Sequence, residues 1–123
     1  MGFLKLFNML LKHKVVNLTI PSGEDYKDAP IFLEEGNIVA CALHTDNTPS
    51  SNVNVKIEDN KSDELHPYVT YKEYQPTNGN HFDSRKPIHF SGGREIKVFA
   101  KSSTALTEDF NFQLVFYIDQ SRG

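Results

Sequence analysis

The chain has no tryptophan, one cysteine and two methionines among 123 residues, and it carries no excess of positive charge. The lone cysteine, Cys41, excludes an intramolecular disulfide, so the fold does not depend on an oxidising compartment. A net charge of −3 provides no general attraction to polyanions, and we therefore expect no nucleic-acid binding. The absence of tryptophan counts against a carbohydrate platform built on indole rings.

Motifs of catalysis and cofactor binding are also missing. The sequence has no Gly-x-Gly-x-x-Gly, P-loop, Gly-x-Ser-x-Gly or His-Glu-x-x-His pattern. Its five histidines are scattered singly, whereas metal sites usually combine ligands that are close in sequence. We predict that the protein is not an enzyme, and we assign no catalytic, cofactor-binding or metal-ligating residue and no cofactor. A small hydrolase, whose catalytic carboxylates would be distant in sequence and adjacent only in the fold, ranks third, after the two binding functions given below.

Three local features have a structural and a chemical interpretation. Cys41 lies in the apolar run 38–43, where we expect a small buried core residue rather than a nucleophile. The segment 59–64 concentrates acceptor oxygens but lacks the glycine and spacing of an EF-hand, so we expect a solvated hairpin loop, with a calcium site as the alternative. His81 and Asp83 lie in a Gly/Asn-rich loop, where solvated turn residues are the default.

The composition is that of one globular domain rich in β-structure. Apolar residues make up 38% and charged residues 24% of the chain, which is too apolar for a disordered protein. Nine phenylalanines and five tyrosines favour strands. A chain of 123 residues is long enough to build a single sizeable core.

The clearest strand pattern closes the chain, over residues 110–118. Every second residue is large and apolar: Phe110, Phe112, Leu114, Phe116 and Ile118. Alternate residues of a strand share one face, so these five line one buried face. The other parity begins polar, at Asn111 and Gln113, and becomes apolar at Val115 and Tyr117, which predicts a second face that is partly covered.

Similar alternation recurs along the chain, with turn residues between the strands. Residues 38–45 are apolar on both parities and are expected to form a central strand, whereas residues 68–74 alternate aromatic residues and threonine with charges, as in a half-buried strand. About eight strands result, typical of an all-β protein. We predict a single antiparallel β-sandwich over 15–123, preferably jelly-roll-like, with the following core residues: Val55, Ile57, Ile96, Val98, Phe112, Leu114 and Phe116.

Residues 1–14 differ from the rest, because they are basic and because their polar positions recur at helical spacing. This pattern predicts a short amphipathic helix. Its candidate assembly or membrane contacts are Phe3, Leu4, Lys5, Phe7, Leu10, Leu11 and Lys12. Three interpretations stay open: packing on its own sandwich or a neighbouring subunit, lying on a membrane surface, or acting as a targeting segment.

Four stretches together resemble the strands of small all-β virion proteins of bacteriophages: 30–40, 85–93, 96–100 and 112–116. The resemblance implies a capsid-associated, decoration, penton-like or fibre-base protein. Such proteins act in the virion as homo-oligomers in contact with other virion proteins. The resemblance supplies no active-site residue.

We therefore expect a non-enzymatic structural protein of a phage particle that acts through self-assembly and protein–protein contacts. The alternative is a carbohydrate-binding β-sandwich module, cytoplasmic or secreted, whose surface would use tyrosines together with loop Asn and Asp residues.

Overall fold

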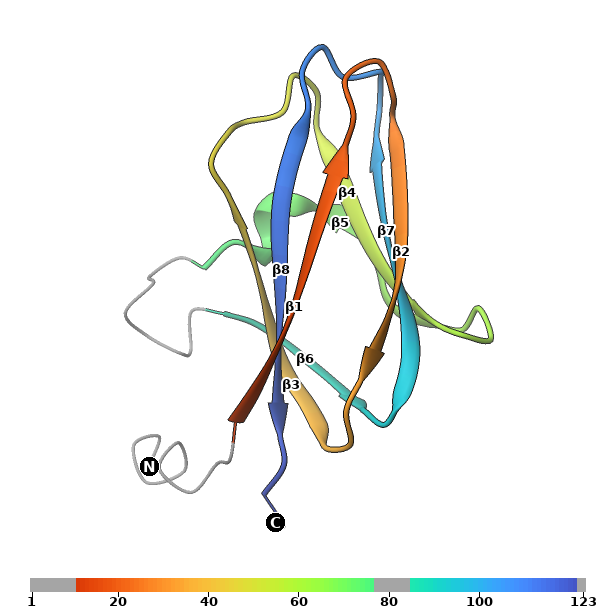
Figure 1. The fold of residues 1–123 in the computed structure, drawn as a ribbon, viewed down its shortest axis with the longest axis vertical. Coiled ribbons are helices and arrows are strands. Elements are labelled where there is room, and N and C mark those ends of the chain that lie inside the picture. Colours follow the sequence, from red (N-terminus) through yellow and green to blue (C-terminus); the bar gives the residue numbers. More distant parts are fainter. Residues whose placement is uncertain (1–10, 77–84, 122–123) are drawn as a thin grey trace.

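The computed structural model describes residues 11–76 and 85–121, which form eight strands and one 3₁₀ helix (Figure 1). The elements are β1 (Leu11–Ile20), β2 (Tyr26–Leu33), β3 (Asn37–Thr45), β4 (Val53–Asp59), β5 (Glu64–Thr70), η1 (Tyr71–Tyr74), β6 (Lys86–Ser91), β7 (Arg94–Ser102) and β8 (Phe110–Asp119). The prediction of an all-β sandwich is confirmed.

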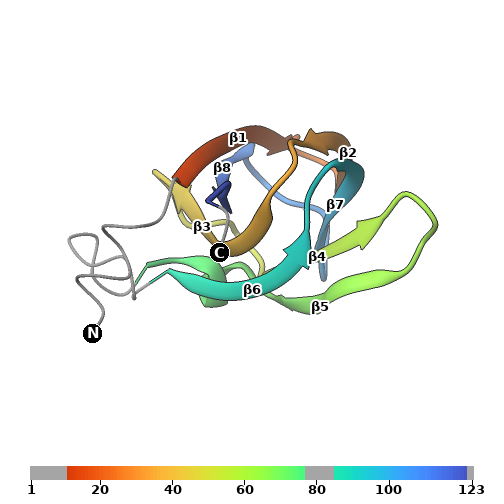
Figure 2. The same ribbon diagram turned by 90° about the horizontal axis from the view of Figure 1, so that it is seen from below.

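The strands form two four-stranded antiparallel sheets. Sheet A has the order β1-β8-β3-β6 and sheet B the order β2-β7-β4-β5. The pairing is nested: β1 pairs with β8, β2 with β7, β3 with β6 and β4 with β5. The chain therefore behaves as one long hairpin wrapped around a core, and Figure 2 shows the strands surrounding that core when the molecule is seen from below.

Strand alternation accounts for the core between the sheets. All seven residues predicted to be buried are at most 3% exposed: Val55, Ile57, Ile96, Val98, Phe112, Leu114 and Phe116. Their neighbours in sequence point to the outer faces, as the burial pattern of β4 shows by its strict alternation. Cys41 also lies in this core, as predicted, and is fully buried.

The two-sided burial predicted for β3 and β8 is also confirmed. Strand β3 is central, since it pairs with both β6 and β8. A second, smaller apolar cluster lies on the outer face of sheet A and comprises Ala40, Ala42, Val115 and Tyr117. The outer face of β8 is therefore polar at Asn111 and Gln113 and apolar at Val115 and Tyr117.

The predicted N-terminal helix ending at Lys14 is wrong. The last four residues assigned to it, Leu11–Lys14, are extended and pair with β8, from Leu11 opposite Asp119 to Lys14 opposite Phe116. The pairing with β8 overrides the local helical spacing, because a short isolated helix is only marginally stable in water. The remaining residues of the predicted helix, 1–10, lie outside the described residues.

The strand predicted over residues 68–74 is correct only in its first half. After β5 ends at Thr70, the chain forms η1, whose Tyr71 and Tyr74 are both buried. A spacing of three residues places two side chains on one side of a 3₁₀ helix, which a strand could not do. Tyr71 packs edge-on against Phe110, with 5.3 Å between ring centroids. Within the described residues, no helix has the length and apolar character needed to cross a membrane.

Candidate interaction surfaces

Two nucleophilic groups of the described residues, the Cys41 thiol and the Tyr74 hydroxyl, are buried. Cys41 is fully buried, and its burial raises the pKa of the thiol to about 12. Burial also raises the pKa of Tyr74, whose hydroxyl donates to the Val55 carbonyl at 3.3 Å. Across residues 11–76 and 85–121, no group of three or more His, Cys, Asp or Glu side chains is arranged to hold a metal ion.

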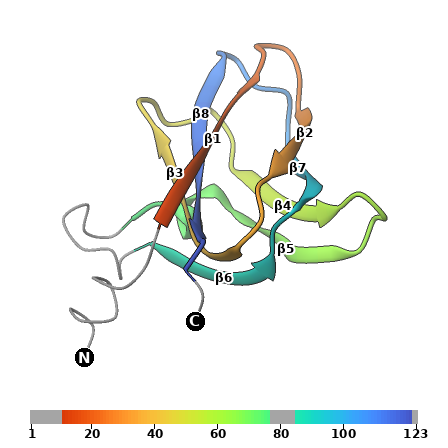
Figure 3. The ribbon, with the colours of Figure 1, turned by 60° about the horizontal axis from the view of Figure 1, so that its bottom comes forward.

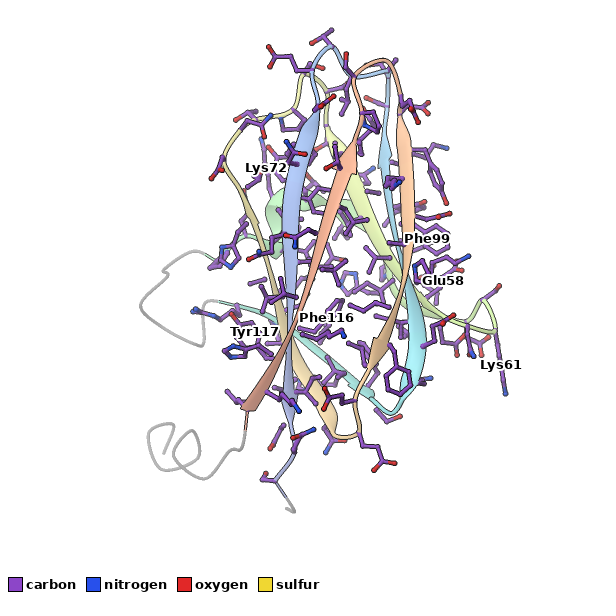
Figure 4. The ribbon with its side chains drawn as sticks, in the orientation of Figure 1. Glu58, Lys61, Lys72, Phe99, Phe116 and Tyr117 are labelled. Carbon is purple, nitrogen blue, oxygen red and sulfur yellow. The ribbon has the colours of Figure 1, made fainter. Side chains whose placement is uncertain are left out.

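The acidic segment 59–64 forms the hairpin between β4 and β5, and its first carboxylate organises the loop. Asp59 Oδ1 accepts the backbone N–H of Lys61 at 2.8 Å and of Asp63 at 2.9 Å. These two bonds lower the pKa of Asp59, and the bond from Asp63 has the larger effect. Arg94 Nη1 lies 3.5 Å from the other carboxylate oxygen of Asp59, Oδ2. The carboxylate thus holds the hairpin, with Lys61 at the tip in Figure 4.

A row of aromatic and lysine side chains crosses the outer face of sheet B. It consists of Tyr26, Phe99, Lys56 and Tyr68, one residue from each strand of the sheet. Phe99 and Lys56 are directly opposite in the β7–β4 register. The ammonium group of Lys56 lies 4.9 Å from the ring centroids of both Phe99 and Tyr68, a distance suited to cation–π attraction.

Carboxylates on the same face hold the aromatic row in place. Lys56 Nζ lies 2.6 Å from Glu58 Oε2, and this hydrogen-bonded ion pair raises the pKa of Lys56. The Tyr26 hydroxyl donates to Asp28 at 2.8 Å. The pKa of Tyr26 is raised, mainly by partial burial and to a smaller extent by this hydrogen bond and by the negative charge of Asp28. Figure 4 shows Phe99 and Glu58 on this side of the sandwich.

The aromatic row is accessible although its polar atoms are paired. Tyr26 is 39% exposed and Tyr68 37% exposed, and Phe32, on the same face of β2, is 56% exposed. These are three of the four large exposed hydrophobic residues in the described part of the chain. Ordered aromatic rings on an open sheet are typical of surfaces that contact another molecule.

The outer face of sheet A is polar at one end. An open groove of about 700 Å³ lies there, lined among others by His44 and Asp46. Its floor is a ladder of side-chain bonds between β1 and β8: Gln113 donates to Asn17 at 3.2 Å, and Thr19 donates to Asn111. Amide and hydroxyl groups of this kind can bind a polar ligand such as a sugar, but here they already bind each other.

The other end of that face carries the second apolar cluster. Tyr117 is 7% exposed, and the His13 ring packs edge-on against it, with 4.8 Å between centroids. Arg85 Nε donates to the Tyr117 hydroxyl at 3.2 Å, and the guanidinium lies 5.6 Å from the ring centroid. Phe116, the preceding residue, points into the core, so adjacent residues of β8 serve opposite faces (Figure 4).

Most residues predicted as assembly or membrane contacts lie outside the described residues: Phe3, Leu4, Lys5, Phe7 and Leu10. The other two, Leu11 and Lys12, lie in β1. Lys12 Nζ is 2.7 Å from Glu34 Oε2, and this contact lowers the pKa of Glu34. His81 and Asp83 also lie outside the described residues.

The aromatic row was not predicted from the sequence; of its residues, only Tyr68 lies in a stretch, 68–74, whose aromatic pattern was noted. Its four residues come from positions 26, 56, 68 and 99, and only the sheet brings them together. The available signal was that Lys56 and Phe99 each occupy the outward parity of an alternating strand.

Comparison with protein-family models and with curated proteins finds no match. Matches among solved structures include the Yersinia pseudotuberculosis-derived mitogen, at 11% identity and a TM-score of 0.45 over 93% of this chain and 92% of that one. The capsid of Helicobacter pylori bacteriophage KHP30 matches at 11% identity and a TM-score of 0.46, over 90% of each chain. The cyanophage Pam1 capsid matches at 14% identity and a TM-score of 0.46, over 91% of this chain and 86% of that one. All three matches have TM-scores below 0.5 and identities of at most 14%, and they transfer no function to this chain.

Proposed function

We propose that the protein is a non-enzymatic structural subunit of a phage particle, which acts by binding copies of itself and other virion proteins. The observation that carries this proposal is the exposed outer face of sheet B, where Tyr26, Phe32 and Tyr68 are presented on a rigid sheet. Aromatic residues are enriched in protein–protein interfaces, where they bury large areas at low entropic cost.

The winding of the chain supports the same proposal. Nested pairing of the first strand with the last, and of each inner pair in turn, is how an eight-stranded jelly roll is wound. Viral capsid domains are among the proteins that use this architecture. The stretches that resemble small phage virion proteins lie in five of these strands: β2, β3, β6, β7 and β8.

A carbohydrate-binding module is the second candidate, because of the polar groove on sheet A. Asp46 and His44 line the groove beside the amide ladder of Asn17 and Gln113. For a sugar to bind, its hydroxyl groups would have to replace side-chain bonds that the protein already makes.

The test combines sedimentation of the full chain at micromolar concentration with mass spectrometry of phage particles purified from a host that carries the gene. The proposal predicts a discrete oligomer and the presence of the chain in the particles. The double variant Tyr68→Ser, Phe32→Ser should weaken assembly while the protein stays folded, whereas His89→Ser, an exposed change on β6 in the other sheet, should leave assembly unchanged. A stable monomer that is absent from particles and binds an oligosaccharide on a glycan array would replace this proposal with the module.

A further inference from the structure

The second apolar cluster lies on the outer face of sheet A, yet its residues are buried like those of the core. Ala42 is fully buried, and Ala40, Val115 and Tyr117 are at most 7% exposed. The described strands all belong to the two sheets, and η1 turns its two tyrosines into the core between them. No described element therefore lies over this outer face.

Uncovered positions elsewhere in the fold differ from this cluster. None of the outward side chains of β4 and β7, the central strands of sheet B, is buried. In the polar half of sheet A, outward His44 is exposed and Gln113 is half-buried. Val15 and Val115 are directly opposite in the β1–β8 register, but Val15 is 46% exposed and Val115 7%. These differences indicate a cover that lies over β8 and β3 and leaves β1 open.

The residues that precede β1 leave the sheet close to this cluster. Leu11, the first residue of β1, lies opposite Asp119, and Figure 3 shows the start of β1 beside the end of β8. Tyr117 and Val115 lie two and four residues back along β8, or roughly 7 and 13 Å at about 3.3 Å per residue. Ten extended residues reach up to about 33 Å, so residues 1–10 are long enough to turn back and cross the cluster.

The composition of residues 1–10 also suits an apolar cover. Seven of these ten residues are large and apolar: Met1, Phe3, Leu4, Leu6, Phe7, Met9 and Leu10. The segment 77–84, which ends beside Arg85, has a single one, Phe82. Apolar side chains cover an apolar cluster favourably, because both surfaces are removed from water.

We propose that residues 1–10 fold back over the outer face of sheet A in their own chain and cover the second apolar cluster. Of the three roles left open for this segment, this one is packing on its own sandwich. Phe3, Phe7 and Leu10 are then engaged within the chain and are not available to a membrane or a neighbouring subunit. The inference goes beyond the proposed function, because it assigns the outer face of sheet A to an internal contact and leaves sheet B as the assembly face.

Thiol labelling of the full-length chain tests the cover. The thiol introduced by Val115→Cys should react slowly with a small polar thiol reagent. Adding Phe3→Ser, Phe7→Ser and Leu10→Ser should accelerate that reaction about tenfold or more, because burial of each large apolar side chain favours the covered state by roughly that factor. The native Cys41 is buried and should stay unreactive in every variant, which shows that the fold is intact.

Two matched controls separate the cover from a general loosening of the sheet. Gln113→Cys lies on the same face of β8 in its polar half and should react rapidly with or without the three serine substitutions. Lys5→Ser with Asn8→Ser changes the polar positions of the segment and should leave the Val115→Cys rate unchanged.

Rapid labelling of Val115→Cys in the otherwise unchanged chain, or equal rates with and without the three serine substitutions, would overturn the proposal. A labelling rate that rises when the protein is diluted would also overturn it, because the cover would then come from a second copy. None of these results affects the proposed function, which is tested by sedimentation and by variants of sheet B.

Discussion

Gly92→Ala should destabilise the fold, because two turns meet at this glycine with no room for a side chain. The Gly92 N–H donates to the Gly36 carbonyl at 2.7 Å, and the Gly93 N–H donates to the Leu33 and Glu34 carbonyls at 2.8 and 2.9 Å. These bonds join the β2–β3 turn to the β6–β7 turn, and so join the two sheets at that end of the sandwich.

The size of the effect follows from the geometry. A Cβ atom at position 92 would lie 2.1 Å from the Glu34 carbonyl oxygen and 3.2 Å from that of Gly36. Both obstacles are backbone, so the turns would have to separate by about 1 Å, and the bonds between them would be lost. At about 0.5–1.5 kcal/mol for each bond, with backbone strain in addition, we expect a loss of about 2–4 kcal/mol. For a domain of this length, that corresponds to a fall in melting temperature of roughly 8–16 °C.

Urea denaturation and thermal unfolding measure this loss. The matched control is Gly23→Ala, where a Cβ meets nothing within 4 Å and only the positive φ of +85° opposes the substitution. Left-handed backbone costs a non-glycine residue about 1–2 kcal/mol, so the control should be the milder variant. A Gly92→Ala variant as stable as wild type, or no less stable than the control, would refute the close packing of the two turns.

Three further changes have defined outcomes. Leu114→Ala removes a fully buried core side chain and should cost about 2–5 kcal/mol in urea denaturation; a change within experimental error would mean that β8 is wrongly oriented. Because the folded-state pKa of Asp59 lies below its ordinary 3.8, its charge stabilises the fold above about pH 4, and this advantage over Asp59→Asn should disappear as the pH falls through the folded-state value. If the stability difference between the two proteins is the same at pH 2.5 and pH 7, the Asp59 bonds do not contribute as described. Deleting residues 1–14 should destabilise the fold more than deleting residues 1–10, since only the longer deletion removes four β1–β8 pairs; equal melting temperatures would contradict that pairing.

The local pattern of the chain determined which faces are buried. In β8, alternation alone predicted the core residues Phe112, Leu114 and Phe116, and the change from polar to apolar on the other parity predicted the covered part of the outer face. In β3, apolar residues on both parities predicted a central strand. These predictions succeeded because successive side chains of a strand point to opposite faces, so the two-residue period of the strand itself shows which face is buried.

The same local reasoning failed where a contact distant in sequence decided the conformation. Residues 11–14 have helical spacing, yet they are extended because β8 offers them hydrogen-bond partners. Residues 71–74 alternate like a strand, yet they form η1 because Tyr71 and Tyr74 both enter the core. In each case, the energy of the tertiary contact exceeds the small preference of a short segment.

The interaction surfaces were decided by the tertiary structure. The aromatic row joins residues from four strands, and the second apolar cluster joins residues from β3 and β8. A strand's period shows which side chains point outward, and the sequence by itself determined that for Lys56, between Val55 and Ile57, and for Phe99, next to Val98. Which outward side chains become neighbours depends on how the whole chain closes on itself, and no short segment carries that information.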